Sequence, residues 1–298
     1  MEIFTELATT DGLSLALGYF DGVHIGHEKV IQSAVNFANK FDCKSAVITF
    51  EDHPCCTLWD VGPKYILQKE KRIEYIQSLG IDYLFLLDFA KMKNLTGEDY
   101  IKQILVKNFS PRCIVTGFNH YFGAGKSGDT DLLEKNSTLY GYKYIKIPSE
   151  KFEDEIISST AIRNYLQGGN IVSANKMLGH EFSISGEVVE GNKIGRTIGF
   201  PTANINYPQQ LIDIPLGAYK TVTKVNNIEY KSITNCGIKP TVSVGNSPVL
   251  ETHLINFEED LYGQNIEVKF LQFLRPEQKF SSLGELKNQI NIDLQSVL

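Results

Sequence analysis

The chain has 298 residues, of which 42% are hydrophobic, and its formal net charge is −6. This length fits two domains of ordinary size, each with a buried core. The acidic balance argues against a nucleic-acid partner, since binding a nucleic acid requires a basic face that neutralises phosphates. It leaves small phosphorylated ligands open, because a few local cations suffice for them.

The cysteines and the N-terminus indicate where the protein works. The five cysteines are irregularly spaced and form no CxxC pair, which is typical of reduced thiols rather than of a disulfide framework or a zinc site. Residues 1–17 lack the basic and apolar regions of a signal peptide. The apolar runs are too short to span a bilayer. We therefore expect a cytoplasmic protein with no membrane partner.

The first half of the chain alternates between strand and helix patterns. Leu13–Phe20 is an apolar run that predicts a buried strand, Gly26–Lys40 has helical spacing, and Lys44–Phe50 is β-branched. Further helices are expected over 70–79, 98–108 and 131–140, and further strands over 81–88, 113–118 and 144–147. This alternation predicts a doubly wound parallel α/β sheet, whose ligands bind beyond the carboxyl ends of the strands.

The second half is rich in strand patterns. Two short helices are expected over 159–166 and 171–178, followed by strands over 182–189, 217–225, 228–234, 250–257 and 266–274. Several short strands at regular intervals predict a small antiparallel β-barrel. Asn226 and Asn227 form a plausible tight hairpin turn. Ser282 and Glu285 have capping-box spacing at the start of a C-terminal helix. We place the domains at 1–180 and 181–298.

The segment Gly18–His27 (GYFDGVHIGH) ends the first strand and opens the first helix. Its glycines let the backbone approach a ligand, and a helix N-terminus offers N–H groups and partial positive charge to phosphate. His24 and His27 are three residues apart, share a helix face, and can stabilise the negative charge that develops in nucleotidyl transfer. The alternatives are two ordinary surface histidines, or a metal site that has no third ligand nearby in sequence.

Two further segments carry groups suited to phosphate. Ser158, Ser159 and Thr160 are hydroxyl donors at a helix start, and Arg163 lies about one turn on, where a guanidinium can hold a phosphate. An ordinary N-cap is the alternative role for Ser159 or Thr160. Gly117–Gly128 (GFNHYFGAGKSG) contains Gly-Lys-Ser but is not a P-loop. A P-loop needs a glycine five positions before Gly125, and this chain has His120 there.

Gly191–Asn204 (GNKIGRTIGFPTAN) is the glycine-rich segment of the second half. Lys193 and Arg196 could embrace a triphosphate within a flexible loop. Thr202 and Asn204 are two apart in an extended segment and offer hard oxygen ligands to Mg²⁺. For any one of these residues alone, the alternative is an ordinary barrel loop with no ligand.

Taken together, these motifs resemble those of the bifunctional prokaryotic riboflavin kinase/FAD synthetases. Gly18–His27 resembles the HxGH signature of the nucleotidylyltransferase superfamily. In the first half the further similar strings are Phe50–Pro54, Gly117–Gly128 and Ile157–Arg163. In the second half they are Gly191–Asn204, Asn235–Thr241, Glu251–Gly263 and Phe273–Phe280. The resemblance covers about residues 13 to 295.

The resemblance implies two ATP-dependent reactions that use Mg²⁺: the C-terminal domain converts riboflavin to FMN, and the N-terminal domain adenylylates FMN to FAD with release of pyrophosphate. It implies catalytic roles for His24, His27, Arg163 and Glu251, with Glu251 as the base on the ribityl 5′-hydroxyl. The implied nucleotide-binding residues are Gly18, Phe20, Asp21, Gly26, Asn119, Ser158, Ser159, Thr160, Gly191, Lys193, Arg196 and Thr202. Thr202 and Asn204 are implied to hold the metal, and Arg275 to contact the flavin. No protein partner is indicated.

The chain departs from the family pattern at three positions. His120 stands where the family usually has an aromatic residue, and Tyr121 and Lys126 stand where arginines are common. These departures keep open a riboflavin kinase whose nucleotidylyltransferase domain is weakened or altered, or acts on another phosphorylated acceptor. A third alternative is a flavin-binding sensor that catalyses no reaction. It would leave Glu251 with no role, and the sequence shows no DNA-binding helix pair or basic patch of the kind that sensors carry.

Overall fold

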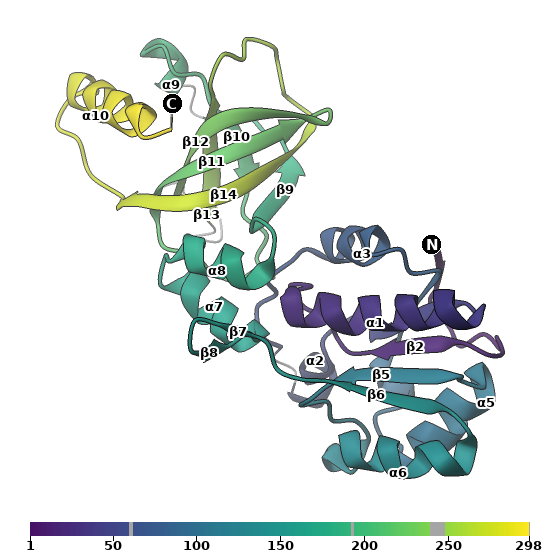
Figure 1. Ribbon diagram of the computed structural model, residues 1–298. Helices are drawn as coiled ribbons and strands as arrows, with labels where there is room; N and C mark the ends of the chain where they lie inside the picture. The colour runs from purple at the N-terminus through teal and green to yellow at the C-terminus, as the bar shows by residue number, and fades with distance from the viewer. Residues whose placement is uncertain (60–61, 192–193, 239–247, 298) are drawn as a thin grey trace. The chain divides into compact units, whose positions relative to one another are not determined.

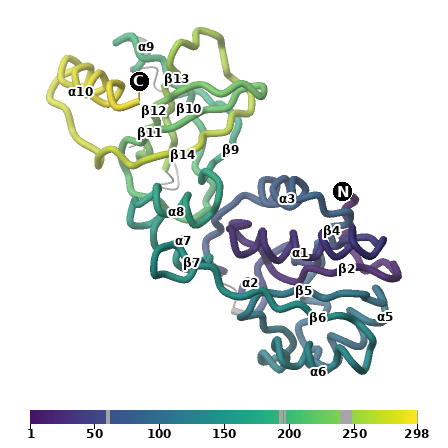
Figure 2. Tube along the Cα trace, in the orientation of Figure 1, coloured from purple at the N-terminus to yellow at the C-terminus, as the bar shows by residue number. Residues whose placement is uncertain are grey.

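The computed structural model describes residues 1–59, 62–191, 194–238 and 248–297, apart from the side chains of Trp59, Ile194 and Arg196. The chain forms two compact units. The first unit comprises Met1–Pro63 and Lys69–Ser158, and the second comprises Lys64–Gln68 and Ser159–Leu298. Figures 1 and 2 trace both units along the chain. The domain boundary predicted near residue 180 stays a prediction.

The first unit contains a six-stranded parallel sheet in the order β1-β4-β3-β2-β5-β6, which confirms the predicted doubly wound fold. The strands are β1 (Glu2–Phe4), β2 (Ser14–Leu17), β3 (Ser45–Phe50), β4 (Tyr83–Leu87), β5 (Cys113–Gly117) and β6 (Lys143–Ile147). Strands β2 to β5 are almost wholly buried and apolar, as both-side burial requires. The strand β1, a short edge strand, was not predicted from the sequence.

Helices cover both faces of this sheet. Figure 1 shows α1 (Ile25–Phe41) and α3 (Lys69–Ser78) on one side, and α5 (Lys107–Phe109) and α6 (Thr130–Tyr140) on the other. The element α5 ends a continuous helical run that starts with α4 (Gly97–Asp99) and passes through η2 (Tyr100–Val106). The run buries Ile101, Leu105 and Phe109 in the core. The remaining elements are α2 (Pro54–Trp59), η1 (Phe89–Lys91), η3 (Ala124–Lys126), β7 (Lys151–Phe152) and β8 (Glu155–Ile156).

The order of the strands identifies where a ligand is expected. From β2 the chain winds outward to β3 and β4, then returns to the other side of β2 to form β5 and β6. The direction of winding therefore reverses between β2 and β5. Open α/β sheets bind ligands beyond the carboxyl ends of the strands at such a switch point. The segment Gly18–His27 follows β2 at this edge.

The second unit contains a six-stranded antiparallel sheet in the order β10-β13-β12-β11-β14-β9. The strands are β9 (Ser183–Glu187), β10 (Ala203–Asn206), β11 (Gly217–Val225), β12 (Ile228–Ile238), β13 (Pro248–Leu254) and β14 (Asn265–Pro276). The two end strands approach each other through Val189, whose N–H donates to the Asn204 carbonyl at 2.8 Å. The sheet therefore nearly closes into the predicted barrel. The strand β10 was not predicted from the sequence, since it has only four residues.

Four helices accompany the barrel in the described part of the second unit: α7 (Ser159–Gln167), α8 (Ile171–Leu178), α9 (Ile194–Thr197) and α10 (Leu283–Gln295). The turn between β11 and β12 has positive φ at Asn226 and Asn227 (48° and 68°), which confirms the predicted hairpin. At the start of α10 the Ser282 hydroxyl accepts from the Glu285 N–H, and the Glu285 carboxylate accepts from the Ser281 N–H. The predicted capping box therefore forms with one difference: the Glu285 carboxylate accepts from the N–H of Ser281 rather than from that of Ser282.

Candidate active sites

The loop that follows β2 has an unusual backbone. Phe20, Gly22 and Val23 all have positive φ, at 60°, 83° and 38°. Phe20 is buried, and a Cβ on Gly18 would lie 2.8 Å from its ring. A Cβ on Gly26 would lie 3.2 Å from the His24 ring. A side chain on Gly18 would therefore displace the Phe20 ring, and one on Gly26 would press tightly on His24. From the sequence, these glycines were expected only to let a ligand approach.

His24 and His27 lie together at the start of α1. Their rings stack with centroids 3.5 Å apart and planes 15° apart. His24 is the N-cap, and its Nδ1 accepts from the His27 N–H at 3.2 Å. Nδ1 of His24 therefore carries the lone pair, and Nε2 carries the ring proton. The edge of Phe20 packs on His27 at 5.3 Å. The two imidazoles are thus fixed beside the helix N-terminus.

An apolar cavity of about 260 Å³ lies beside this loop in the first unit. Gly18 and Tyr19 line it from the end of β2, together with Phe50, Met92 and Tyr100. His120, Tyr121 and Lys126, which depart from the family pattern, also line it. Asn119, which was predicted to contact the nucleotide, is exposed.

His120 is held as a neutral ring in this cavity wall. Burial lowers the pKa of His120 to about 4. Its ring stacks on Phe122, with centroids 5.7 Å apart, and Phe122 packs in turn on Tyr100. The Nε2 atom is buried and has no hydrogen-bond partner among the described residues. At neutral pH the ring therefore behaves as an aromatic surface, although it is not one of the usual aromatic residues.

The predicted phosphate-binding string, residues 158–163, spans the point in the sequence where the first unit ends and the second resumes. Ser158 closes the first unit, and Ser159 begins α7 of the second. Within the second unit, Nε of Arg163 donates to the Lys64 carbonyl at 2.9 Å. Sequence reasoning gave no sign of this bond, because the partners are 99 residues apart. The contact of Arg163 with phosphate stays a prediction.

The register of the barrel brings together two residues that the sequence analysis singled out. Asn204 on β10 is directly opposite Glu251 on β13, and Glu251 is directly opposite Asn235 on β12. Directly opposed residues of antiparallel strands point to the same face. Asn204, Glu251 and Asn235 therefore form a polar row across three strands. Asn235 is an addition to the predicted set, which used its string only as a family motif.

Asn204 has an unsatisfied oxygen at the centre of this region. The residue is 4% exposed, and its Oδ1 has no hydrogen-bond partner among the described residues. Its Nδ2 donates to the Thr202 carbonyl at 3.3 Å. A Cβ on Gly191 would lie 2.5 Å from Nδ2, so glycine is needed for the loop to pack here. A buried carbonyl oxygen without a donor is costly, and a bound cation would satisfy it.

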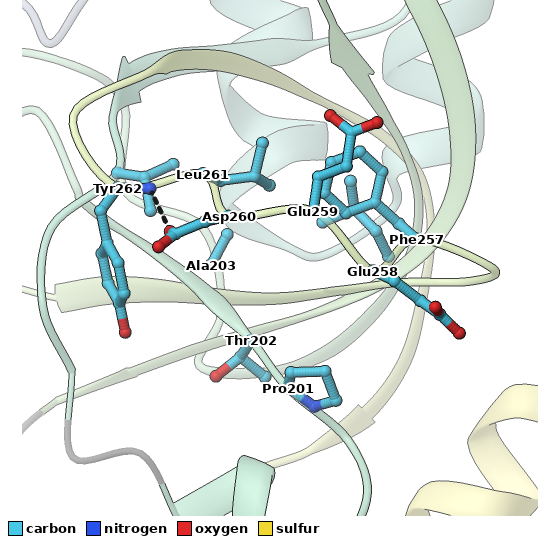
Figure 3. A pocket seen from close by; sticks show the side chains of 11 residues that line it. Pro201, Thr202, Ala203, Phe257, Glu258, Glu259, Asp260, Leu261 and Tyr262 are labelled. Carbon is cyan, nitrogen blue, oxygen red and sulfur yellow. Dashed lines mark hydrogen bonds between the residues drawn. The ribbon is translucent and has the colours of Figure 1, made fainter.

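Thr202 opens onto a second cavity, of about 300 Å³. Figure 3 shows Pro201 and Thr202 on one side and the loop 257–262 on the other. The loop contributes Glu258, Glu259 and Asp260, and Asp260 accepts from the Tyr262 N–H at 3.0 Å. Lys193 lies outside the described residues, as does the side chain of Arg196. Residues 239–241 of the Asn235–Thr241 string also lie outside them.

Arg275 is bound by a carboxylate of α10. Its Nη2 lies 2.8 Å from Oδ2 of Asp293, and its Nε donates to both carboxylate oxygens at 3.1 Å. Asp293 is 6% exposed, so the pair is largely shielded from water. The Phe280 ring lies 5.9 Å from the guanidinium. Sequence reasoning did not find Asp293, and a flavin contact for Arg275 stays a prediction.

Among the described residues, no group of three or more His, Cys, Asp or Glu side chains is arranged to hold a metal ion. Within the same part of the chain, no helix has both the length and the apolar character needed to cross a membrane.

Comparisons with known proteins match both halves of the chain. A family model described as FAD synthetase matches residues 7–161, and one described as riboflavin kinase matches residues 178–298. Bifunctional riboflavin kinase/FMN adenylyltransferases are similar along nearly their whole length. The protein from Buchnera aphidicola subsp. Schizaphis graminum is 37% identical over 95% of this chain and 92% of its own. Those from Escherichia coli K12 and Bacillus subtilis are each 36% identical, over 96% and 95% of this chain and 92% and 91% of their own.

A solved structure shares the fold of the whole chain. The crystal structure of a protein from Streptococcus pneumoniae, described as a macrolide-efflux protein, has a TM-score of 0.90 and 29% identity. The match covers 100% of this chain and 99% of that one. The two units therefore occur in the same order in both sequences.

Proposed function

Since the chain belongs to the family of bifunctional riboflavin kinase/FMN adenylyltransferases, we propose how its two units divide the work. The second unit phosphorylates riboflavin with ATP, giving FMN. The first unit transfers AMP from ATP to FMN, giving FAD and pyrophosphate. The observation that carries this proposal is the pairing of Asn204 with Glu251 in one unit and the stacking of His24 on His27 in the other. The match of the FAD synthetase model supports two activities over a kinase alone.

In the kinase site Glu251 acts as the general base. Its carboxylate accepts the proton of the ribityl 5′-hydroxyl as the oxygen bonds to the γ-phosphorus of ATP, and the bond to the β-phosphate oxygen breaks to release ADP. The cavity beside Thr202 takes the nucleotide, and Gly191, Lys193 and Arg196 contribute the loop over its phosphates. Arg275 lies on β14, opposite Ala218 of β11, and helps to bind the flavin.

A kinase and an adenylyltransferase that use ATP imply a divalent metal, which we propose is Mg²⁺. Thr202 and Asn204 would hold it in the second unit, because Oδ1 of Asn204 is a hard oxygen that is buried without a donor. When bound, the cation neutralises charge on the β- and γ-phosphates. The role of Asn204 is to present that oxygen from a strand held opposite Glu251.

In the first unit the reaction needs charge stabilisation rather than a base. The phosphate of FMN is already ionised near neutral pH and attacks the α-phosphorus of ATP directly, and pyrophosphate leaves. His24, His27 and the N–H groups at the start of α1 stabilise the charge that develops. Gly18, Phe20, Asp21, Gly26 and Asn119 shape the nucleotide site. Ser158, Ser159, Thr160 and Arg163 bind phosphates of the nucleotide, as their resemblance to the family motif implies.

The apolar cavity of the first unit is the site we propose for the isoalloxazine ring of FMN. Flat aromatic ligands bind in largely apolar cavities with a few polar groups. The walls are apolar and aromatic, and the neutral His120 ring adds to them without adding charge. Lys126 supplies a cation at the same cavity, which suits an anionic flavin. A cytoplasmic location and the exclusion of nucleic acid remain predictions from the sequence.

The test is a chromatographic time course with riboflavin, ATP and Mg²⁺ on wild type, Glu251→Gln and His27→Ala. Wild type makes FMN and then FAD. Glu251→Gln lowers FMN formation by about 10²-fold or more but still converts supplied FMN to FAD. His27→Ala accumulates FMN, with FAD synthesis lowered by about 10²-fold. Each variant is the control for the other unit. Loss of both activities in either variant, or no FAD from wild type, contradicts the proposal.

A further inference from the structure

Arg72 on α3 is a buried cation that the mechanism above does not use. The residue is 3% exposed. Its guanidinium donates to three main-chain carbonyls: Nη1 to Tyr19 at 3.2 Å, and Nη2 to Phe50 at 2.9 Å and Glu51 at 3.3 Å. In the described part of the chain it pairs with no carboxylate, and its Nε is buried without a hydrogen-bond partner. Among these residues, no neighbouring anion therefore compensates the charge of Arg72.

The three carbonyls belong to the carboxyl edge of the parallel sheet. Tyr19 follows the end of β2 and stands in the Gly18–His27 loop, while Phe50 ends β3. The Tyr19 carbonyl also accepts from the Thr49 hydroxyl at 3.0 Å. The guanidinium lies 4.4 Å from the centre of the Tyr19 ring. The Tyr19 and His53 rings pack edge to face, with centroids 4.6 Å apart. Arg72 thus fixes the start of the loop that carries both histidines.

A buried arginine in this position is costly unless its charge is used. Removing an ion from water carries a large penalty, which carbonyl dipoles offset only in part. The proposed adenylyl transfer collects the phosphates of ATP and FMN at this same edge. A fixed positive charge in a medium of low dielectric constant favours that negative charge over distances longer than a hydrogen bond.

We propose that Arg72 is a positioning residue of the adenylyltransferase site and its internal counter-charge. It holds the Tyr19 backbone, and with it the histidine loop, and its positive potential favours binding of the anionic substrates. It acts through the loop and through its field, without touching the substrate. This inference rests on the adenylyl transfer proposed for the first unit.

The test compares two variants. Arg72→Gln keeps an N–H donor but loses the charge, and Arg72→Lys keeps the charge but loses the planar guanidinium with its several donors. The matched control is Arg112→Gln. Arg112 is exposed and also donates to a main-chain carbonyl, that of Phe41 at 2.8 Å, but it precedes β5 at the amino edge of the sheet. The measurements are kcat and KM for FMN and ATP in FAD synthesis, inhibition by inorganic pyrophosphate, and thermal unfolding. Riboflavin phosphorylation by the same sample reports on the second unit.

We expect Arg72→Gln to lower kcat/KM for FAD synthesis by about ten- to hundredfold and to weaken inhibition by pyrophosphate by a similar factor. Arg72→Lys recovers most of the affinity for pyrophosphate. Riboflavin phosphorylation is unchanged in both, and Arg112→Gln matches wild type. If Arg72→Gln unfolds, Arg72→Lys is compared with wild type: near wild-type inhibition by pyrophosphate supports the inference, and inhibition weakened by about tenfold or more overturns it.

Two outcomes overturn the inference when Arg72→Gln folds. One is wild-type kinetics in Arg72→Gln. The other is pyrophosphate inhibition weakened as much in Arg72→Lys as in Arg72→Gln, which indicates a purely structural role. Failure of the proposed function is distinct from both, because wild type itself would then make no FAD.

Discussion

At the scale of single residues, His120 is where the chain departs from its family in a way that the structure explains. An imidazole in place of an aromatic residue would add a charge to an apolar cavity if it were protonated. Burial prevents this, since it lowers the pKa of His120 to about 4. The ring also stacks on Phe122, as a phenyl ring in its place would. The departure therefore preserves the apolar character of the cavity at neutral pH.

The lowered pKa of His120 makes a prediction about stability and pH. The folded protein binds this proton less readily than the unfolded chain, so the contribution of the neutral ring is fully present above the ordinary value of 6.5. It is lost progressively as the pH falls from 6.5 towards 4. His120→Phe should thus flatten the pH dependence of thermal unfolding in that window while keeping FAD synthesis at pH 7.5. A control, His180→Phe, replaces an imidazole outside the cavity and should leave the slope as in wild type. An unchanged slope in His120→Phe would contradict the argument.

At the scale of elements, His253 ties β13 to the segment that leads into β10. It stands two residues after Glu251 on the same face, and its Nδ1 donates to the Pro201 carbonyl at 2.8 Å. The edge of its ring meets Phe200 at 5.4 Å. Pro201 directly precedes Thr202, so the bond fixes where the proposed metal-binding strand begins. Sequence reasoning quoted this histidine within a motif but gave it no role.

We predict that His253→Ala raises the KM for ATP in riboflavin phosphorylation by about tenfold, because a misplaced Thr202 weakens nucleotide and metal binding. His253→Asn should recover most of the loss, since the amide N–H₂ can reach the carbonyl that Nδ1 reaches. FAD synthesis from supplied FMN is the control and should not change. Steady-state kinetics at saturating and limiting Mg²⁺ measures the effect. Equal loss in the Asn and Ala variants would show that the hydrogen bond is not what matters.

The elements that could be predicted from the sequence are those whose patterns are local. Helix spacing gives α1 to within a residue at each end, and the two asparagines give the turn after β11. The strand β10 could not be predicted, because its four residues become a strand only by pairing with β13. The same pairing places Asn204 directly opposite Glu251. The candidate residues were thus accessible from motifs, whereas their geometry depended on long-range register.

At the scale of the whole molecule, the two units are not two consecutive pieces of chain. Residues Lys64–Gln68 stand between α2 and α3 but belong to the second unit. Tyr65 exchanges backbone bonds with Gln210 and Ile212, both at 2.8 Å. Ile66 and Leu67 are almost fully buried. No pattern in the sequence marks this short segment, because its apolar residues fit either unit and only tertiary contacts decide between them.

Gln68 offers a test of this assignment in the full chain. Its side-chain amide mimics a strand neighbour: Nε2 donates to the Ser185 carbonyl at 2.9 Å, and Oε1 accepts from the Ser185 N–H at 2.8 Å. Gln68→Ala leaves both groups of Ser185 without these partners, which costs about 1–3 kcal/mol. We expect heat to inactivate riboflavin phosphorylation at a temperature several degrees lower. FAD synthesis from FMN should lose less heat resistance, because His24 and His27 lie in the first unit, although Arg163 lies in the second.

The matched control is Gln77→Ala, which removes an exposed glutamine from α3 in the first unit and should leave both activities as they are. Heat inactivation of each activity, measured on the same sample, separates the two units without cutting the chain. If Gln68→Ala sensitises FAD synthesis instead, the segment 64–68 supports the first unit. The second unit would then be continuous in sequence, as the motifs alone suggest. If it sensitises riboflavin phosphorylation alone, the stability of the kinase depends on a segment that the chain supplies from within its adenylyltransferase half.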